Sequence, residues 1–324
     1  MTGVTAIVPV WNRHDLLQRA VSGLRAQTQR VDEIVVVDDG SVEPAQASGA
    51  RIVRLDRHSG FAPAVNEGIR QTHTPLVAIV NNDVDLSPNW LERLLAGLRP
   101  QDWFATGKIL QADDRTRIDA TFDALSRGGT AWRVGFGCLD GPSFDEPRDI
   151  HFAPFTAALF RTELFDKAGL LDEHFESYLE DVDFCLRCAL AGYGGRYIPS
   201  ALAWHQGSAT LGRWHPETTR RLSRNQVFLV AKHFQGRYIW PVLIAQTLWG
   251  LVALRHGRFW SWLTGKIEGL RRARALARGP LLSPSNNLSS ILNQSEQDIR
   301  RAHTDSTRNV YWTLYFLLTA TGAK

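Results

Sequence analysis

The feature that most constrains the fold is an alternation of short apolar runs with helical patterns through the first 110 residues. The run Ile-Val-Val-Val at 34–37 is typical of a central parallel strand, which is buried on both faces. Similar runs lie at 4–10, 51–55 and 76–80, and segments with apolar residues at helical spacing separate them, as at 16–24. Such alternation predicts an α/β fold in which helices flank a mostly parallel sheet.

The same pattern continues, with one gap, to about residue 215. We expect helices at 62–70, 87–98, 162–168 and 180–191, and strands at 155–161 and 196–203. The gap, residues 111–150, is rich in Gly, Asp and Arg and shows no periodicity. It is therefore predicted to be a long irregular excursion.

Composition fits a folded protein of about two domains. The 324 residues are 44% hydrophobic and 22% charged, which is sufficient for a large buried core. Three cysteines, an odd number, argue against a disulfide framework and indicate a reducing compartment. Cys185 and Cys188 have redox-motif spacing, but they fall inside an expected helix and supply only half a zinc site. The first residues carry no basic leader, so we expect no signal peptide.

The composition changes after about residue 215. Residues 220–234 predict a basic amphipathic helix, and 238–254 contain 17 residues without a charge, interrupted by Pro241 and Gly250. That run falls short of the about 20 apolar residues that a spanning helix needs. Between 251 and 280, seven Lys or Arg accompany a single acid. This helical, basic and apolar extension predicts contact with a membrane surface.

Other interpretations of the extension remain open. It could instead form a packing or dimer surface, a true membrane span, or a basic surface that binds nucleic acid in a salt-sensitive way. The Ser-, Asn- and Gln-rich residues 279–308 predict a flexible linker. The apolar residues 310–318 are expected to dock on the same surface as 238–254.

Polar side chains follow two of the expected strands. Asp38 and Asp39 end one strand in a turn that Gly40 permits, and Asn82 and Asp83 follow another. Ligands of such sheets bind beyond the carboxyl ends of the strands, so both turns are expected to face one crevice. Carboxylate oxygens there suit ribose hydroxyls or a hard divalent cation. His205, after the last strand, offers a nitrogen ligand, although a lone histidine is more often structural.

An acidic cluster precedes the helix expected at 180–191. Glu180, Asp181 and Asp183 lie within four positions, and like charges held this close raise one another's pKa. A raised pKa suits a general base that works near neutral pH. The alternative is a solvated acidic first turn, which the helix dipole favours.

Several motifs together resemble, in the right order, an inverting family 2 glycosyltransferase with a GT-A fold, of the bacterial rhamnosyltransferase-like branch. The resemblance covers about residues 4–210 and rests on Ile7-Val-Pro-Val-Trp-Asn12, Ile34-Val-Val-Val-Asp-Asp-Gly-Ser41, Gly60-Phe-Ala-Pro-Ala-Val-Asn-Glu-Gly68, Asn81-Asn-Asp-Val84, Gly169-Leu-Leu-Asp-Glu173, Glu180-Asp-Val-Asp183 and His205. Together these motifs are specific, although each is modest alone.

The resemblance implies transfer of a sugar from a nucleotide-diphosphate donor to an acceptor hydroxyl, with inversion. It implies Asp181 as the general base, with Asp83 and His205 holding Mg²⁺ or Mn²⁺. The residues that it implies for the nucleotide sugar are Pro9, Trp11, Asp38, Asp39, Asn66 and Asn82. The residues that it implies for the acceptor site or its support are Asp172, Glu173, Glu180 and Asp183; helix capping is an equally good interpretation of Asp172 and Glu173.

One departure bears on activity. The metal motif begins with Asn81 where the family has an aspartate, so a catalytically degenerate nucleotide-sugar-binding protein is the alternative. Intact Asp181 opposes that alternative. A nucleotidyltransferase on a similar sheet would need a Gly- and Lys/Arg-rich loop after the first strand, which the 9–14 turn lacks.

The expected domains are a GT-A catalytic domain at 1–215 and a helical C-terminal extension at 216–324. Within the first, 1–110 would bind the nucleotide sugar and 111–215 the acceptor. The expected acceptor is a glycan or lipid-linked glycan in cell-surface polysaccharide assembly. We expect a cytoplasmic enzyme, peripheral at the inner face of the plasma membrane, with no nucleic acid partner; an oligomer is allowed.

Overall fold

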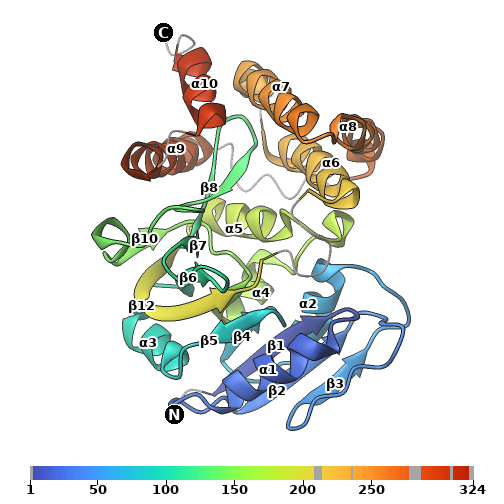
Figure 1. Cartoon of the computed structure of the whole chain (residues 1–324), viewed down its shortest axis with the longest axis vertical. Coiled ribbons are helices and arrows are strands. Elements are labelled where there is room, and N and C mark those ends of the chain that lie inside the picture. The colour runs from blue at the N-terminus through green and yellow to red at the C-terminus, as the bar shows by residue number, and fades with distance from the viewer. Residues whose placement is uncertain (1–2, 208–213, 235, 277–285, 307–308, 321–324) are drawn as a thin grey trace. The chain divides into compact units, whose positions relative to one another are not determined.

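The computed structural model of the chain describes residues 3–207, 214–234, 236–276, 286–306 and 309–320 (Figure 1). The chain forms two compact units. The first comprises Met1–Asp123 and Gly135–Thr210, and the second comprises Ala124–Val134 and Leu211–Lys324. The chain therefore leaves the first unit and returns to it before the C-terminal helices begin.

The first unit alternates strands and helices, as the apolar runs predict. Its elements are β1 (Val4–Val10), α1 (His14–Arg25), β2 (Glu33–Asp38), β3 (Arg51–Arg54), α2 (Phe61–Arg70), β4 (Leu76–Val80), β5 (Val84–Leu86), α3 (Trp90–Gly97), β6 (Phe104–Gln111), β7 (Ile118–Ala120), η1 (Pro142–Phe144), β10 (Arg148–Ile150), β11 (Ala157–Arg161), α4 (Glu163–Ala168), η2 (Glu173–Phe175), α5 (Glu180–Leu190) and β12 (Gly195–His205).

A single large sheet forms the centre of this unit. Its main path runs β10-β12-β6-β11-β4-β1-β2-β3. The strands β3, β2, β1 and β4 are parallel, β12 is parallel to β6, and β11 lies antiparallel between β4 and β6. Six strands of the path therefore share one direction, and only β11 and β10 oppose them. The predicted mostly parallel α/β sheet is confirmed.

Helices cover both faces of the sheet. Alternate residues of β1, such as Ala6 and Val8, pack with Leu17 of α1 and Leu91 of α3 in one buried cluster. Ile7 points the other way, towards α2, where a Cβ on Gly68 would come within 2.5 Å of its Cγ2. Side chains alternate across a strand, so this one strand supplies both cores.

An aromatic cluster fixes α5 against the second face. Phe184 of α5 stacks on Phe165 of α4 with ring centroids 4.9 Å apart, and Phe155 lies 4.7 Å from Phe160 of β11. Rings at these distances bury large apolar areas and attract one another. Cys188, on the same helix, is buried, and burial raises its pKa to about 12. A thiol that stays protonated is a poor nucleophile, which agrees with a structural role.

The predicted irregular excursion at 111–150 is wrong in part. It contains the short strands β7 and β10, and a two-stranded sheet of β8 (Asp123–Leu125) and β9 (Ala131–Arg133). The sequence analysis also missed β6, which pairs with β12 in the middle of the sheet. Lys108 makes β6 look exposed, but its ammonium group is buried against Asp140, 2.7 Å away, and also contacts Asp145.

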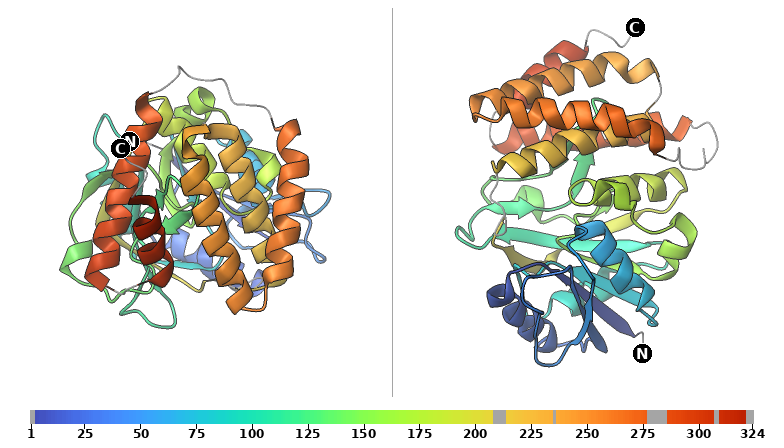
Figure 2. Two further views of the ribbon diagram at one scale, coloured as in Figure 1. Left: turned by 90° about the horizontal axis from the view of Figure 1, so that it is seen from above. Right: turned by 90° about the vertical axis from the view of Figure 1, so that its right-hand side faces the viewer.

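The second unit consists mainly of helices. They are α6 (Pro216–His233), η3 (Gly236–Tyr238), α7 (Ile239–Arg255), α8 (Phe259–Arg272), η4 (Ala273–Ala275), α9 (Asn286–Ser306) and α10 (Val310–Thr319). α8 packs against α6 and α7, and α10 packs against α7 (Figure 2). Neither Pro241 nor Gly250 interrupts α7. Pro241 is tolerated because it lies in the first turn, where amides need no helical partner.

The linker predicted at 279–308 is wrong where the structure describes it. Residues 286–306 form α9, and residues 279–285 and 307–308 lie outside the described part of the chain. Leu288, Ile291, Leu292 and Ile299 are buried and recur at helical spacing. The polar composition concealed this apolar stripe.

The segment 124–134 belongs to the second unit through specific contacts. The Leu125 amide donates to Ser295 Oγ at 2.6 Å, and Arg127 Nε pairs with Glu296 Oε2 at 2.8 Å. The hydroxyls of Thr130 and Tyr311 lie 2.8 Å apart. This segment is thereby held to α9 and α10, although it interrupts the chain of the first unit.

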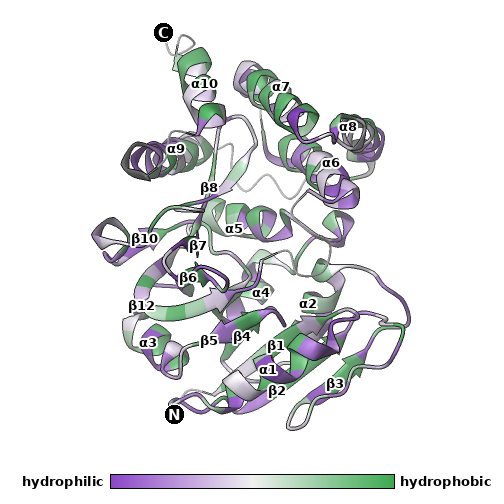
Figure 3. Ribbon diagram, viewed as in Figure 1, coloured by the Kyte–Doolittle hydropathy of each residue, from purple (hydrophilic) through white to green (hydrophobic). Residues whose placement is uncertain are grey.

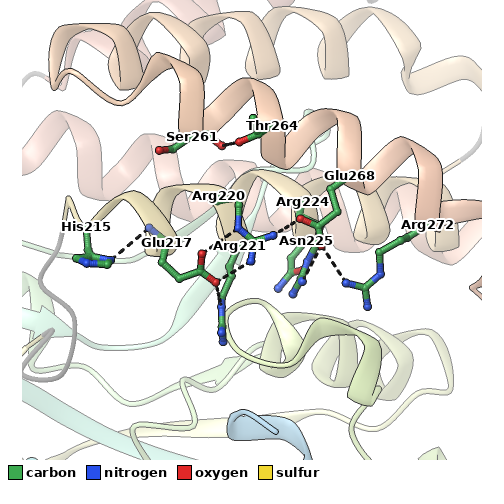
Figure 4. Close-up of polar contacts among 10 residues, drawn as sticks. All are labelled: His215, Glu217, Arg220, Arg221, Arg224, Asn225, Ser261, Thr264, Glu268 and Arg272. Carbon is green, nitrogen blue, oxygen red and sulfur yellow. Dashed lines mark hydrogen bonds and ion pairs between the residues drawn. The ribbon is translucent and has the colours of Figure 1, made fainter. Parts of the chain in front are cut away.

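An ion-pair network joins α6 to α8 (Figure 4). Arg224 is 1% exposed, and its Nη1 donates to Glu268 Oε1 at 3.2 Å. Glu217 accepts from Arg220 at 2.7 Å and from Arg221 at 2.6 Å. Hydrogen bonds from Arg220 and Arg221 lower the pKa of Glu217 to about 2 against the opposing effect of burial. A buried guanidinium requires such partners, since removing them leaves a charge without compensation.

Candidate active site

The ends of the same-direction strands bring several polar side chains to one edge of the sheet. β2 ends at Asp38, β4 is followed by Asn81, and β12 ends at His205. These strands run in the same direction, so their carboxyl ends share that edge. Ligands of open α/β sheets bind at this edge, as the sequence analysis expected.

His205 lies between two carboxylates. Its Nε2 is 3.3 Å from Asp83 Oδ1, and its Nδ1 is 2.8 Å from Asp119 Oδ2. All three side chains are nearly buried, with exposures of 6%, 11% and 5%. Burial alone lowers the pKa of His205, but the hydrogen bonds to Asp119 and Asp83 outweigh it and raise the pKa to about 9. The structure thus brings the two predicted metal ligands together.

This group fits a divalent cation. Asn81 Oδ1 is buried and has no hydrogen-bond partner among the described atoms, and the buried Asp83 Oδ1 faces His205 Nε2 at 3.3 Å. A metal-bound histidine commonly donates its other ring N–H to a carboxylate, which is the position of Asp119. Among the described residues, no three His, Cys, Asp or Glu side chains converge on one ion position. Asp83 and His205 would hold the ion, with substrate phosphates and water completing its shell.

Asp38 organises the turn after β2. Its side chain is fully buried, accepts from the amides of Ser41 at 2.9 Å and Ala45 at 3.0 Å, and pairs with Arg54 at 2.6 Å. Burial raises the pKa of Asp38, but the hydrogen bonds of Ser41 and Ala45 and the charge of Arg54 outweigh it and lower the pKa. The oxygens of this carboxylate are thus engaged within the protein.

Asp39 links that turn to the start of α2. Its carboxylate accepts from the amides of Ser59 at 2.7 Å and Gly60 at 2.8 Å, and it lies 2.7 Å from His58 Nδ1. The His58 ring stacks on Trp11, with centroids 4.1 Å apart and an interplanar angle of 17°. An aromatic platform next to a carboxylate is a suitable place for a nucleobase and its ribose.

The start of α2 holds the loop that leads to α5. Glu176 O accepts from the Ala62 amide at 2.8 Å, and Ser177 Oγ accepts from the Phe61 amide at 3.1 Å. In this loop Glu176, Tyr178 and Leu179 have φ values of 60°, 75° and 66°. Non-glycine residues rarely adopt such values, and local strain of this kind clusters at functional sites.

The predicted base, Asp181, lies in the first turn of α5, immediately after this loop. Its Oδ1 accepts from the Val182 amide at 2.8 Å. Glu180 and Asp183 in the same turn are buried, and Asp183 pairs with Arg187 at 3.1 Å. Arg187 in turn donates to Leu170 O at 2.7 Å. Asp183 therefore anchors α5 to the preceding segment, and Asp181 is the partly exposed carboxylate of the cluster.

The remaining predicted residues have roles within the protein. Asn66 donates to Leu171 O and Glu173 Oε1, each at 2.9 Å, and accepts from the Leu171 amide at 2.9 Å. Its amide is thus used in holding the segment before α5, a role different from the ribose contact expected of it. Asp172 caps η2 by accepting from the His174 amide at 3.1 Å, as the capping interpretation predicts.

Two further predicted residues lie at the end of β1 and after β4. Pro9 is buried in β1 opposite Val37, and Asn82 Nδ2 donates to Arg13 O at 3.3 Å. The charge of Asp83 contributes to a raised Arg13 pKa, after the larger effect of a hydrogen bond to Asp15. Arg13, whose guanidinium pairs with Asp15 at 2.9 Å, therefore lies in the same region as Asp83, and sequence reasoning did not identify it.

Sequence reasoning also missed Asp119 and His58. Asp119 lies on β7, inside the segment predicted to be irregular, and its partner His205 is 86 residues away. No spacing pattern in the sequence indicates such a pair. His58 had a weak signal, since it precedes the Gly60 motif that the resemblance picked out.

The fold is that of proteins with a GT-A fold. A crystal structure of GalNAc-T7 with UDP, GalNAc and Mn²⁺ superposes with a TM-score of 0.62 at 14% sequence identity, covering 93% of this chain and 58% of that one. Residues 5–169 match the family model described as Glycosyl transferase family 2. The match covers more than half of the 324 residues, and the chain belongs to glycosyl transferase family 2.

Curated relatives include two glycosyltransferases of Mycobacterium tuberculosis. The pre-mycofactocin glycosyltransferase is 29% identical over 219 residues, which cover 65% of this chain and 44% of that protein. The N-acetylglucosaminyl-diphospho-decaprenol L-rhamnosyltransferase is 25% identical over 285 residues, which cover 79% of this chain and 92% of that protein. The chain spans less than half the length of several other relatives that it matches. The predicted family is confirmed.

Proposed function

We propose that this chain transfers a sugar, with inversion, from a nucleotide-diphosphate donor to an acceptor hydroxyl in the assembly of a cell-surface or lipid-linked glycan. The observation that carries the proposal is the buried group of Asp83, His205 and Asp119 at the carboxyl edge of the sheet. Family membership and relatives that are named for sugar transfer support it.

Asp83 and His205 would hold Mg²⁺ or Mn²⁺, with Asp119 orienting the imidazole. When bound, such a cation neutralises the charge that develops on the departing diphosphate. Asn81 supplies an amide oxygen where a carboxylate would add charge, so we expect weaker ion binding in the absence of nucleotide than a second aspartate would give.

Trp11 and His58 would form the surface on which the nucleobase stacks, and Asp39 would meet the nucleoside. Because Asp39 also accepts from Ser59 and Gly60, it sets the position of the α2 start. Asp38 and Asn66 support this region through contacts within the protein. Stacking on this surface accepts any base.

Asp181 would act as the general base. An inverting transfer requires a proton acceptor on the face of the sugar opposite the leaving group, and a carboxylate serves when its environment raises its pKa. The proton passes from the acceptor hydroxyl to Asp181 as the oxygen attacks the anomeric carbon and the C–O bond to the diphosphate breaks.

A lipid-linked acceptor would place the enzyme at the cytoplasmic face of a membrane. One described helix, Gly236–Arg255, is long and apolar enough to cross a bilayer by length and composition. We propose a peripheral location, with the second unit in contact with lipid. The competing proposal is a nucleotide-sugar-binding protein without catalysis, for which the replacement at Asn81 is the supporting observation.

The test begins with a panel of nucleotide sugars, screened with Mn²⁺ for ligand-dependent thermal stabilisation. With the donor found, Asp181→Asn is expected to abolish transfer while donor binding and the circular dichroism spectrum are retained. Asp166→Asn, on the exposed face of α4, is the matched control. Near-wild-type transfer by Asp181→Asn would remove the base assignment, and donor binding without transfer in the wild type would favour the binding protein.

Asp83→Ala tests the metal role separately. We expect it to abolish the stabilisation that Mn²⁺ adds to donor binding, because the chain would lose its carboxylate ligand. Mn²⁺ binding is followed directly by titration calorimetry, so the result does not depend on catalysis. Wild-type activity in the presence of a chelator would contradict this role.

A further inference from the structure

The second unit exposes an apolar surface that its own helices leave uncovered. Among the described residues, all large apolar side chains that are exposed lie in α7, α8 or α10, apart from Val42 and Leu139 of the first unit. The exposed residues of α7 and α10 are Ile239, Trp240, Leu243, Leu251, Leu254, Val310, Leu314, Leu317 and Leu318. We call these nine side chains the apolar face; Figure 3 shows how apolar both helices are.

The apolar face is organised along the helices. Trp240, Leu243, Leu251 and Leu254 follow the spacing of one helical stripe, so α7 presents them together. Trp240 is 57% exposed and Leu251 is 56% exposed. The opposite side of α7 is also apolar, with Ala245 and Leu248 buried. A helix that is apolar on all sides belongs in a core or in lipid, and large exposed patches mark interaction sites.

Basic residues lie on α7 itself and at the end of α8, the helix that packs against it. Arg255 ends α7 directly after Leu254, and Arg271 and Arg274 lie at the end of α8 and in η4; all three are exposed. The one acid between 251 and 280, Glu268, is engaged with Arg220, Arg224 and Arg272 (Figure 4). Glu268 therefore does not neutralise Arg255, Arg271 or Arg274. Apolar side chains with basic neighbours match the two layers of an anionic membrane surface.

We propose that the apolar face docks in the plane of an anionic lipid bilayer, with the arginines at the phosphate level. This inference rests on the membrane location proposed above and names the residues that contact lipid. Its test does not measure sugar transfer, so the lipid contact and the sugar transfer can each fail without the other. Exposed Trp240 and Trp260 suit this orientation, because tryptophan favours the boundary between headgroups and acyl chains.

Contacts of α7 favour an orientation along the membrane over one across it. Gln246 donates to Gly128 O at 3.0 Å and accepts from Lys266, and Trp249 Nε1 donates to Ser223 Oγ at 3.3 Å. These bonds lie on the side of α7 that packs within the second unit. A transmembrane orientation would break them and leave polar groups in hydrocarbon, which is costly.

A second copy of this chain is the competing occupant. A symmetric pair would bring the same patch of both copies together. Both copies would then bring Arg255, Arg271 and Arg274 towards one interface, and like charges gathered at an interface weaken it. These charges therefore favour anionic lipid over self-association.

Sedimentation with vesicles tests the proposal on the full chain. We expect the protein to pellet with phosphatidylglycerol–phosphatidylcholine vesicles and much less with phosphatidylcholine alone. Arg271→Gln together with Arg274→Gln should weaken binding to the anionic vesicles roughly 30-fold, since each charge near the surface contributes about fivefold. Arg30→Gln with Arg93→Gln, an exposed pair in the first unit, should leave it unchanged.

The apolar part is tested by Leu251→Ser together with Leu254→Ser. Each change should weaken partitioning about tenfold, because a leucine loses its apolar burial. Leu139→Ser, at a residue that is 63% exposed in the first unit, is the matched control. Failure of the wild type to pellet with anionic vesicles would overturn the proposal. So would a dimer in light scattering that the two serine substitutions dissociate. If the serine variant does not fold, the arginine variants still test the proposal.

Discussion

Replacing Gly60 by alanine should disturb the helix of the candidate base, although no acidic residue is substituted. Gly60 has φ 105° and ψ 179°, values that are essentially confined to glycine. A Cβ built there would lie 2.7 Å from Glu176 O and 2.8 Å from Glu176 C. These are backbone atoms of the loop before α5, so the loop itself must move.

The magnitude follows from two contributions. The backbone conformation costs alanine about 1–3 kcal/mol. Movement of the loop also weakens the hydrogen bonds that Ala62 and Phe61 donate to it, at about 1 kcal/mol each. The expected loss is therefore about 3–5 kcal/mol, or a fall in Tm of roughly 10 °C. Displacement of Asp181 by a fraction of an ångström should lower kcat up to about 100-fold.

The assay combines thermal unfolding, donor affinity by calorimetry and the rate of transfer. We expect kcat to fall more than donor affinity, because the perturbed loop leads to Asp181. Gly137→Ala is the matched control, since Gly137 also has positive φ, 77°, yet no atom lies within 4 Å of the added Cβ. It should lose about 1 kcal/mol and keep its kcat. Unchanged Tm and kcat in Gly60→Ala would refute the coupling between the α2 start and the base.

Three other changes test separate parts of the chain. Asp119→Asn should weaken Mn²⁺ binding about 10–100-fold by calorimetry, because the imidazole of His205 loses its orienting carboxylate. Asp114→Asn is the control. A Mn²⁺ affinity of Asp119→Asn equal to that of the wild type would exclude this role. Phe184→Ala should lower the free energy of unfolding by about 3–5 kcal/mol in urea, since the ring is fully buried among three others. Hydrogen bonds from Arg220 and Arg221 lower the Glu217 pKa in the folded chain from its ordinary value of 4.5 to about 2. Glu217 therefore stabilises the fold fully above pH 4.5 and loses this effect as the pH falls towards 2. Wild type should therefore exceed Glu217→Gln by about 1–2 kcal/mol at pH 7, after allowance for partial exposure, and by little at pH 2. A difference that is independent of pH would contradict this assignment.

The parallel part of the sheet was predictable because its strands are buried on both faces. Central strands such as β2 and β4 must be apolar along their whole length, and this leaves a signal in the sequence. β6 lacks that signal, since Lys108 occupies a buried position through acids that lie 32 and 37 residues away. Compensation by distant partners cannot be read from local composition.

The residues of the candidate site also differ in how clearly the local sequence marks them. Residues in the turns after β2 and β4 were found because strand ends mark them. Asp119 was not, since only the tertiary fold brings it to His205. Asn66 shows the opposite case. Its motif was recognised, but the contacts that occupy its amide come from Leu171 and Glu173, more than 100 residues along the chain.

The excursion at 124–134 has a practical consequence for anyone who wishes to shorten this protein. A fragment that stops at residue 210 would keep these residues but lack Ser295, Glu296 and Tyr311, which hold them. Leu125, which is fully buried in the whole chain, would then meet water, and aggregation of the fragment is the expected outcome. A soluble truncation would need two cuts, with a short polar turn in place of the excursion.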